Sequence, residues 1–171
     1  MFSLSAKEGQ WREPLILPYR KRSLHLTAMK LSPAREKPVK IGRVVIHTDG
    51  AAEPNPGPAA IGATIKDEQG KLITTISQGI GRATNNQAEY KAVIAALEKA
   101  LELGAKQVDI KLDSQLVARQ ISGQYRVKNA ALKPLYQQVK RLQGLLEGFT
   151  ITHIPRQQNR EADNLAYIAL N

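Results

Sequence analysis

The chain contains no cysteine, which excludes disulfide bonds, thiolate metal sites and cysteine nucleophiles. It also lacks any apolar run that approaches the roughly 20 residues of a membrane-spanning helix. The first residues, MFSLSAKEGQWREPLILPYRKR, contain no long apolar segment after a basic one, so they do not predict a secretory signal. These absences predict a cytoplasmic protein without a membrane partner, and we expect it to act as a monomer.

Acidic residues are scarce relative to basic ones. There are 15 Asp and Glu against 25 Lys and Arg, which gives a formal net charge of +10. This charge favours a polyanionic partner, with nucleic acid ahead of an acidic membrane surface. Charge alone fits a merely soluble basic protein equally well. At 171 residues and 42% hydrophobic content, the chain is long enough for one domain with a sizeable core.

The first 40 residues differ in composition from the rest. They hold nine Lys and Arg against three Glu, a balance of +6, and no sustained apolar period. We therefore predict a basic, disordered N-terminal arm over residues 1–40 and a folded domain over residues 41–171. The arm could tether nucleic acid, could be an organelle transit peptide, or could be a functionless extension upstream of a start at Met29. We favour the extension.

From Arg43 onward, the hydrophobic pattern predicts a regular order of elements. Tyr90, Ile94, Leu97 and Leu101 recur at spacings of 4, 3 and 4, which is typical of one helix face. Beta-branched and alternating runs predict strands at 43–49, within 59–79 as a hairpin that turns at 67–70, at 107–113 and at 149–155. Helices are predicted at 86–103, 114–122, 132–146 and 160–170. A hairpin followed by alternating helices and strands implies a mixed sheet with helices packed on it.

Four acidic residues lie at junctions between these elements. They are Asp49 in VVIHTDGAAEPNPGP, Glu89 in TNNQAEY, Asp113 in VDIKLDSQ and Asp163 in PRQQNREADNLA. Each could face one common edge of the sheet. Carboxylate oxygens are suitable ligands for Mg²⁺. In a chain this basic, the four acids suggest a divalent-metal site that works on a phosphate backbone.

Asp49 and Glu89 each have a purely structural alternative. Asp49 precedes Gly50, so it could simply be a turn residue. Glu89 borders the apolar stripe of its helix and could be a rim glutamate paired with a lysine.

Asp113 and Asp163 also have structural alternatives. Asp113 or Ser114 could cap the following helix. Asp163 lies one turn after Asn159, a plausible N-cap, and would complement the helix dipole there. Taken singly, these structural explanations are as good as metal binding.

The motifs around the four acids occur in one order: DG-x4-NPGP, TNN-x2-AE, DSQ and N-x3-D. Over residues 43–170 this series closely resembles the ribonuclease HI family. The resemblance implies an α/β, ribonuclease H-like fold, with a five-stranded mixed sheet in the order 3-2-1-4-5 flanked by helices. It also implies a metal-dependent endoribonuclease that hydrolyses the RNA strand of RNA–DNA hybrids and leaves 5′-phosphate and 3′-hydroxyl ends. Broader action on double-stranded RNA stays open, because A-form shape is recognised largely through phosphates and 2′-hydroxyls.

By the same resemblance, Asp49, Glu89, Asp113 and Asp163 are the catalytic carboxylates and bind two Mg²⁺ ions, with Mn²⁺ as a substitute. Asp49 would bridge both ions, Glu89 and Asp113 would hold the ion near the leaving group, and Asp163 the ion that carries the attacking water. Carboxylates packed this closely should have raised pKa values when no metal is bound. The expected nucleic-acid contacts are Gly50, Asn55, Thr84, Asn85, Asn86, Ser114, Arg156 and Asn159.

Three features depart from the family pattern. Many members carry a mobile histidine in the loop before the last Asp, where this chain has Arg156, which could stabilise phosphate charge or help product leave but cannot act as a base. His153 and His47 lie in predicted strands, and we interpret both as structural. The long basic handle of some relatives is missing, and a smaller patch could replace it or be an ordinary solvated face; its residues are Tyr125, Arg126, Lys128 and Lys133. The arm lacks the aromatic-rich signature of a separate hybrid-binding domain.

Two other kinds of protein fit parts of the pattern. A non-catalytic hybrid-binding module is disfavoured because none of the four acids is missing. A domain cut from a reverse transcriptase or transposon polyprotein is disfavoured because the chain is nearly all one domain.

Overall fold

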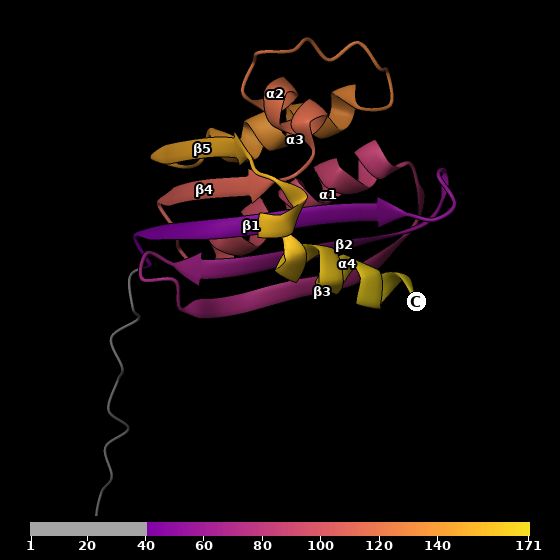
Figure 1. The fold of residues 1–171 in the computed structure, drawn as a ribbon. Coiled ribbons are helices and arrows are strands. Elements are labelled where there is room, and N and C mark those ends of the chain that lie inside the picture. Colours follow the sequence, from indigo (N-terminus) through magenta and orange to yellow (C-terminus); the bar gives the residue numbers. More distant parts are fainter. Residues whose placement is uncertain (1–40) are drawn as a thin grey trace, which may run out of the picture. The chain divides into compact units, whose positions relative to one another are not determined.

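A five-stranded mixed sheet forms the centre of the structure, a computed structural model that describes residues 41–171 (Figure 1). Its order is β3-β2-β1-β4-β5, with β2 antiparallel to both of its neighbours and β4 parallel to both of its own. This confirms the predicted α/β fold and strand order. The strands are β1 (Arg43–Ala52), β2 (Gly57–Asp67), β3 (Leu72–Ala83), β4 (Gln107–Leu112) and β5 (Gly148–His153). The predicted N-terminal arm lies outside the described residues.

Helices cover both faces of this sheet. The short C-terminal helix α4 crosses one face over β1, β2 and β3, while the long helix α1 lies against the other face (Figure 1). The helices are α1 (Asn85–Glu102), α2 (Gln115–Ile121), α3 (Lys133–Gln143) and α4 (Arg160–Leu170), with the 3₁₀ turn η1 (Arg156–Gln158) before α4. The four helices agree with the predicted ones, whereas η1 was expected to be loop. Among residues 41–171, no helix is long and apolar enough to cross a membrane.

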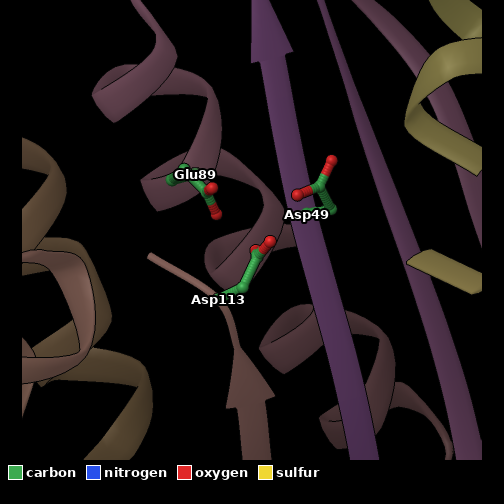
Figure 2. A group of neighbouring side chains, drawn as sticks. All are labelled: Asp49, Glu89 and Asp113. Atoms are coloured by element: carbon green, nitrogen blue, oxygen red, sulfur yellow. The ribbon is translucent and has the colours of Figure 1, made fainter. Parts of the chain in front are cut away.

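The parallel strands β1 and β4 run side by side, and their pairing ends at Thr48 and Leu112, so the residues that follow, Asp49 and Asp113, come close together at one edge of the sheet. β1 itself continues to Ala52, beyond the strand end predicted at Asp49. The first turns of α1 lie at this edge as well (Figure 2). Helix α1 begins there because Thr84 and Gln87 form a capping box, in which each side chain accepts a hydrogen bond from the other residue's backbone N–H. Three segments far apart in the sequence therefore meet at one place.

Two glycines allow the helices to approach β1 and β2 closely. A Cβ on Gly50 would lie 2.2 Å from the carbonyl carbon of Ala88 in α1. On the opposite face, a Cβ on Gly62 would lie 2.2 Å from the carbonyl oxygen of Ala162 in α4. Gly62 pairs with Asp49 in the antiparallel β1–β2 ladder. Directly paired residues carry their Cβ atoms on the same face of the sheet, so the side chain of Asp49 leaves β1 on the α4 face.

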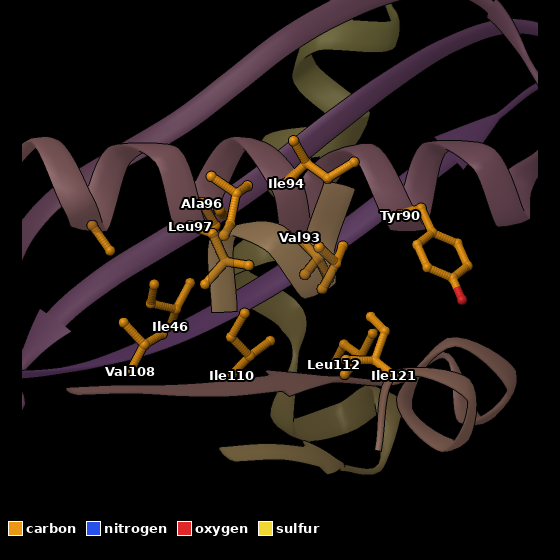
Figure 3. Close-up of a cluster of buried hydrophobic side chains, with 14 of the residues drawn as sticks. Ile46, Tyr90, Val93, Ile94, Ala96, Leu97, Val108, Ile110, Leu112 and Ile121 are labelled. Atoms are coloured by element: carbon orange, nitrogen blue, oxygen red, sulfur yellow. The ribbon is translucent and has the colours of Figure 1, made fainter. Parts of the chain in front are cut away.

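The hydrophobic core fills the space between α1, β1 and β4 (Figure 3). Tyr90 and Leu97 from the predicted helix stripe are fully buried, and so are Ile110 and Leu112 from the alternating strand. Burying a side chain of this size contributes about 1.5–3 kcal/mol. Tyr90 also donates a hydrogen bond of 2.8 Å from its hydroxyl to Oε1 of Gln120, which ties α2 to α1. The core thus fixes α1 and α2 together beside the end of β4.

Candidate active site

Three of the four predicted acids lie together at the strand ends (Figure 2). Asp49 belongs to β1, Glu89 to the second turn of α1, and Asp113 follows β4 directly. Each offers one carboxylate oxygen, and these three oxygens all lie within 4.8 Å of one another. The structure therefore brings together residues that are separated by up to 64 positions in the sequence.

Asp49 and Glu89 are buried, with 6% and 8% of their surfaces exposed. The pKa of Asp49 is raised to about 7, mainly by burial and then by the neighbouring charges of Asp113 and Asp163, which outweigh a lowering by Arg156. The pKa of Glu89 is also raised well above its ordinary value, first by burial and then by the charge of Asp49. The expectation of raised pKa values is confirmed for these two acids. The alternative of Glu89 as a rim glutamate paired with lysine is wrong, because Glu89 is buried and forms no ion pair within residues 41–171.

The donor set fits a divalent cation. Oxygen ligands are what Mg²⁺ and Mn²⁺ prefer, and the cluster offers three carboxylates. Oε2 of Glu89 is buried and has no hydrogen-bond partner among the residues that the structure describes. A buried, unpaired carboxylate oxygen is unfavourable unless a cation or a donor satisfies it. Asp49, Glu89 and Asp113 could together hold such a cation.

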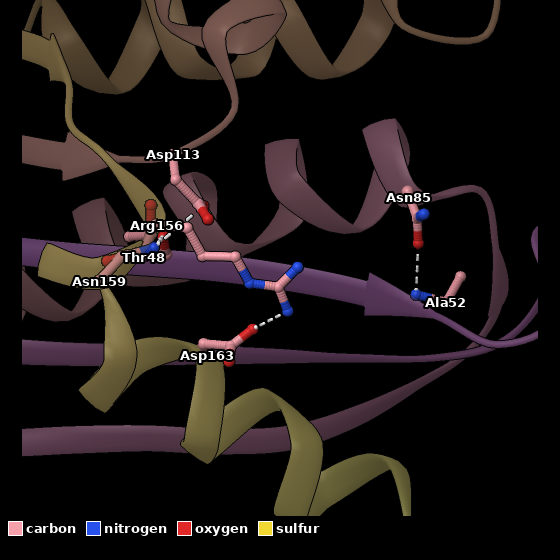
Figure 4. Close-up of polar contacts among 7 residues, drawn as sticks. All are labelled: Thr48, Ala52, Asn85, Asp113, Arg156, Asn159 and Asp163. Carbon is pink, nitrogen blue, oxygen red and sulfur yellow. Dashed lines mark hydrogen bonds and ion pairs between the residues drawn. The ribbon is translucent and has the colours of Figure 1, made fainter.

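Asp163 lies at the same cleft but is engaged differently (Figure 4). Its Oδ1 accepts a hydrogen bond of 2.8 Å from a guanidinium nitrogen of Arg156, and the two form an ion pair. The side chains of Arg156 and Asp163 are 77% and 34% exposed, so this pair is more exposed to solvent than Asp49 and Glu89. The negative charge of Asp163 raises the pKa of Arg156 further, so the guanidinium stays charged.

Asn159 stands at the N-cap position of α4 but does not act as a side-chain cap. It is 1% exposed, and its Nδ2 donates to the carbonyl oxygen of Thr48 at 2.9 Å and to Oδ1 of Asp113 at 3.1 Å (Figure 4). Asn159, expected from the resemblance to contact nucleic acid, therefore lies beneath the cleft rather than on its surface. At α2, the cap is Ser114, whose Oγ accepts a hydrogen bond of 3.4 Å from the N–H of Val117.

The remaining predicted contacts surround the start of α1. Oδ1 of Asn85 accepts a hydrogen bond of 2.6 Å from the N–H of Ala52, at the end of β1 (Figure 4). The N–H of Asn85 donates in turn to Oδ1 of Asn55 at 3.1 Å. These bonds join the loop after β1 to the helix that carries Glu89. Asn86 is exposed beside them.

The four acids and the start of α1 line a cleft of about 330 Å³. Nine of the twelve predicted site residues line it, whereas Asn55, Thr84 and Asn159 support it from outside. Glu53 also lines the cleft and was not singled out from the sequence. The sequence could have indicated Glu53, because it lies between Asp49 and Asn55, two residues that were already predicted to belong to the site.

Neither strand histidine belongs to the cleft. His153 is the last residue of β5, as the strand prediction required, and it is exposed. His47 is half-buried in β1, and burial lowers its pKa, followed by the positive charges of Lys111 and Lys66. No histidine lines the cleft among the residues of the described chain.

Comparisons with known proteins agree with this arrangement. Residues 47–169 match the family model described as "Reverse transcriptase-like". The chain is 41% identical to the ribonuclease HI of Halobacterium salinarum over 135 residues, which cover 79% of this chain and 68% of that protein. It is 40% identical to the bifunctional protein Rv2228c of Mycobacterium tuberculosis over 130 residues, or 75% of this chain, but only 36% of that longer protein.

Solved structures show the same likeness. The crystal structure of RNase H1 from H. salinarum has a TM-score of 0.74 at 42% identity, covering 75% of this chain and 98% of that one. LC11-RNase H1, solved in complex with an RNA/DNA hybrid, has a TM-score of 0.71 at 39% identity, covering 74% and 96%. The sheet order and the acid cluster define the ribonuclease H-like class of α/β proteins. Within that class, the chain belongs to the ribonuclease HI family and is a ribonuclease H.

Proposed function

We propose that this protein hydrolyses the RNA strand of RNA–DNA hybrids at the cleft, with divalent cations held by Asp49, Glu89 and Asp113, and that Asp163 completes the site. The observation that carries the proposal is the group of three carboxylate oxygens within 4.8 Å of one another. Further support comes from the relative solved with an RNA/DNA hybrid, which shares 39% of its residues with this chain.

We infer that two Mg²⁺ ions are the natural cofactor and that Mn²⁺ can substitute. When bound, such ions lower the pKa of a bound water and stabilise charge on the leaving 3′ oxygen, so the products are a 5′-phosphate and a 3′-hydroxyl. Burial of Asp49 and Glu89 strengthens the attraction of this cluster for cations, because Coulomb interactions increase as water is excluded.

Other residues of the cleft suit a phosphate backbone. Asn85 and Asn86 lie in the first turn of α1, where the positive end of the helix dipole favours anions. Arg156 projects into the same cleft with most of its surface exposed. We assign it to phosphate contact or product release rather than to proton transfer, because a guanidinium does not deprotonate in proteins.

A second hollow, of about 550 Å³, offers a further contact for the substrate. It is lined in part by Tyr125, Arg126 and Lys133. The guanidinium of Arg119 lies 5.1 Å from the centre of the Tyr125 ring and also donates a hydrogen bond to the Tyr125 hydroxyl. These two contacts hold the exposed ring in place. Arg126→Ala with Lys133→Ala should weaken hybrid binding and reduce the salt dependence of its binding constant, by a slope of about 1 for each lost phosphate contact. An unchanged slope would instead make this patch an ordinary solvated face.

Cleavage of matched substrates tests the main proposal. The wild-type protein is incubated with the same sequence as RNA–DNA hybrid, RNA duplex and DNA duplex, in Mg²⁺ or Mn²⁺ and in EDTA. We expect hybrid cleavage in the RNA strand only, and none in EDTA. Cleavage of the RNA duplex at a similar rate would select the broader substrate range, and no cleavage in either metal would reject the enzyme.

A non-catalytic hybrid-binding module is distinguished by Asp49→Asn. In Ca²⁺, where we expect binding without turnover, fluorescence anisotropy should show that this variant still binds the hybrid. In Mg²⁺ it should not cleave, while the exposed-helix control Glu98→Gln should cleave like wild type. Equal behaviour of wild type and Asp49→Asn in Mg²⁺ would contradict a catalytic role for the cluster.

A further inference from the structure

Asn159 connects three segments of the acid site (Figure 4). Its side-chain amide donates to the carbonyl oxygen of Thr48, the residue before Asp49, and to a carboxylate oxygen of Asp113. Its own carbonyl oxygen accepts a hydrogen bond of 3.0 Å from the N–H of Asp163. One buried residue is thus bonded to two of the four acids and to the neighbour of a third.

The direction of this amide follows from chemistry. If it were rotated by 180°, Oδ1 would face two other acceptors, the carbonyl of Thr48 and the carboxylate of Asp113, and neither could donate to it. In the observed direction, Oδ1 has no hydrogen-bond partner within the described part of the chain. A capping asparagine would turn this oxygen toward the backbone N–H groups of its own helix, and Asn159 does not. Its donors serve the site instead of the helix.

We propose that Asn159 is a positioning residue: it holds Asp113, the end of β1 and the first turn of α4 in the arrangement that metal binding requires. The inference rests on the proposed function of the same cleft. Bonding one oxygen of Asp113 to Asn159 restricts rotation of a carboxylate that belongs to the three-acid cluster. Residues that hydrogen-bond to a ligating carboxylate in this way orient it and tune its affinity for the metal. The role differs from a substrate contact, because the side chain is buried beneath the cleft.

The test compares Asn159→Ala and Asn159→Asp with Asn164→Ala, a matched change at an exposed asparagine of the same helix. Asn159→Asp keeps the shape of the side chain but removes both donors. For the Asn159 variants we expect kcat on the hybrid and the affinity for Mn²⁺, measured by calorimetry without substrate, each to fall by about 10–100-fold. Hybrid affinity in Ca²⁺ should stay within about 3-fold of wild type, because no substrate contact is lost. Asn164→Ala should change none of these quantities.

Two outcomes would overturn the proposal. A lower melting temperature with unchanged kcat and Mn²⁺ affinity would make Asn159 merely structural. A weaker hybrid affinity with unchanged kcat would make it a substrate contact. Because the calorimetry needs no turnover, it decides the role of Asn159 even if the wild type cleaves no hybrid.

A measurement on the wild type covers the case in which neither variant folds. The side-chain amide protons of Asn159 should exchange slowly with water in NMR spectra, and their chemical shifts should move in Asp113→Ala. Fast exchange, or shifts that ignore Asp113→Ala, would contradict the bond on which the inference depends.

Discussion

The acid site has two unlike halves. In one, Asp49, Glu89 and Asp113 meet across β1, α1 and β4, with two of the three buried and with raised pKa values. In the other, Asp163 on α4 is partly exposed and paired with an exposed Arg156. The first half gathers three carboxylates that form no ion pair with a Lys or Arg of residues 41–171, whereas in the second half Asp163 is paired with Arg156.

The difference lies in what holds each half. The buried half is fixed by the core and by the close approach of α1 to Gly50, so its carboxylates cannot separate to relieve their repulsion. The exposed half lies on a short helix after a single 3₁₀ turn, and its ion pair is solvated. Solvated pairs contribute little, typically about 0–1 kcal/mol. We therefore expect cleavage to depend steeply on the first half and mildly on the second.

The largest effect should come from Glu89→Gln. Neutralising this buried carboxylate removes a ligand of the proposed metal site, and we expect kcat to fall by at least about 100-fold, since metal stabilisation of the transition state is worth several kcal/mol. Steady-state cleavage of the hybrid checks this, with Glu98→Gln on the exposed face of α1 as the control. Activity within a few-fold of wild type would mean that the buried half is not the catalytic one.

Gly50→Ala and Gly62→Ala compare the two halves directly. Each added Cβ would lie 2.2 Å from helix backbone, so each should lower the free energy of unfolding by about 1–3 kcal/mol or more. Gly50→Ala should also reduce Mn²⁺ affinity strongly, because it displaces α1 and with it Glu89. Gly62→Ala displaces α4 and should reduce that affinity less.

Urea unfolding and calorimetry on both variants measure these effects. The control is Gly79→Ala, whose Cβ would come no closer than 3.6 Å to its nearest neighbour. Equal losses of metal affinity at Gly50 and Gly62 would remove the distinction between the halves.

The raised pKa values predict how stability changes with pH in EDTA. The carboxyl of Asp49 ionises near 3.8 when unfolded and at about 7 when folded, so between these values the folded protein binds more protons. The free energy of unfolding should therefore fall as the pH rises from about 4 to 7, and Glu89 contributes with the same sign. Asp49→Asn should flatten this dependence and stabilise the protein at pH 8 by roughly 1–4 kcal/mol, at about 1.4 kcal/mol for each pH unit between the two pKa values. Stability that rises from pH 5 to 8 in EDTA would contradict the shifts.

The same contrast separates what the sequence predicts from what it does not. The spacing of Tyr90, Leu97 and their neighbours identifies a helix, and the alternation of Ile110 and Leu112 identifies a strand. The strand order followed from the family motifs. The nearness of Asp49 and Asp113 follows from the parallel pairing of β1 and β4, because each acid comes directly after the last pair, Thr48 and Leu112.

Other features depend on contacts between distant segments and have no local signal. The closeness of α1 to β1 is set by one missing Cβ at Gly50, which also fits a turn. Asn159 matches an N-cap in sequence, and only the positions of Thr48 and Asp113 show where its donors point. The turn η1 is too short to produce a period, so the pairing of Arg156 with Asp163 could not be predicted either.

The smallest effect is expected from Arg156→Ala. The guanidinium is 77% exposed, so losing its pair with Asp163 should change the free energy of unfolding by less than about 1 kcal/mol. Because Arg156 lowers the pKa of Asp49 and faces the cleft, its loss should reduce cleavage, but by less than about 10-fold, since a solvated charge acts through water. Arg156→Lys, which keeps the charge, should recover most of that activity, and raising the salt concentration should narrow the gap between wild type and Arg156→Ala. A loss as large as that of Glu89→Gln, with no recovery in Arg156→Lys, would mean that the exposed half takes part in the chemistry through the geometry of the guanidinium and not through its charge alone.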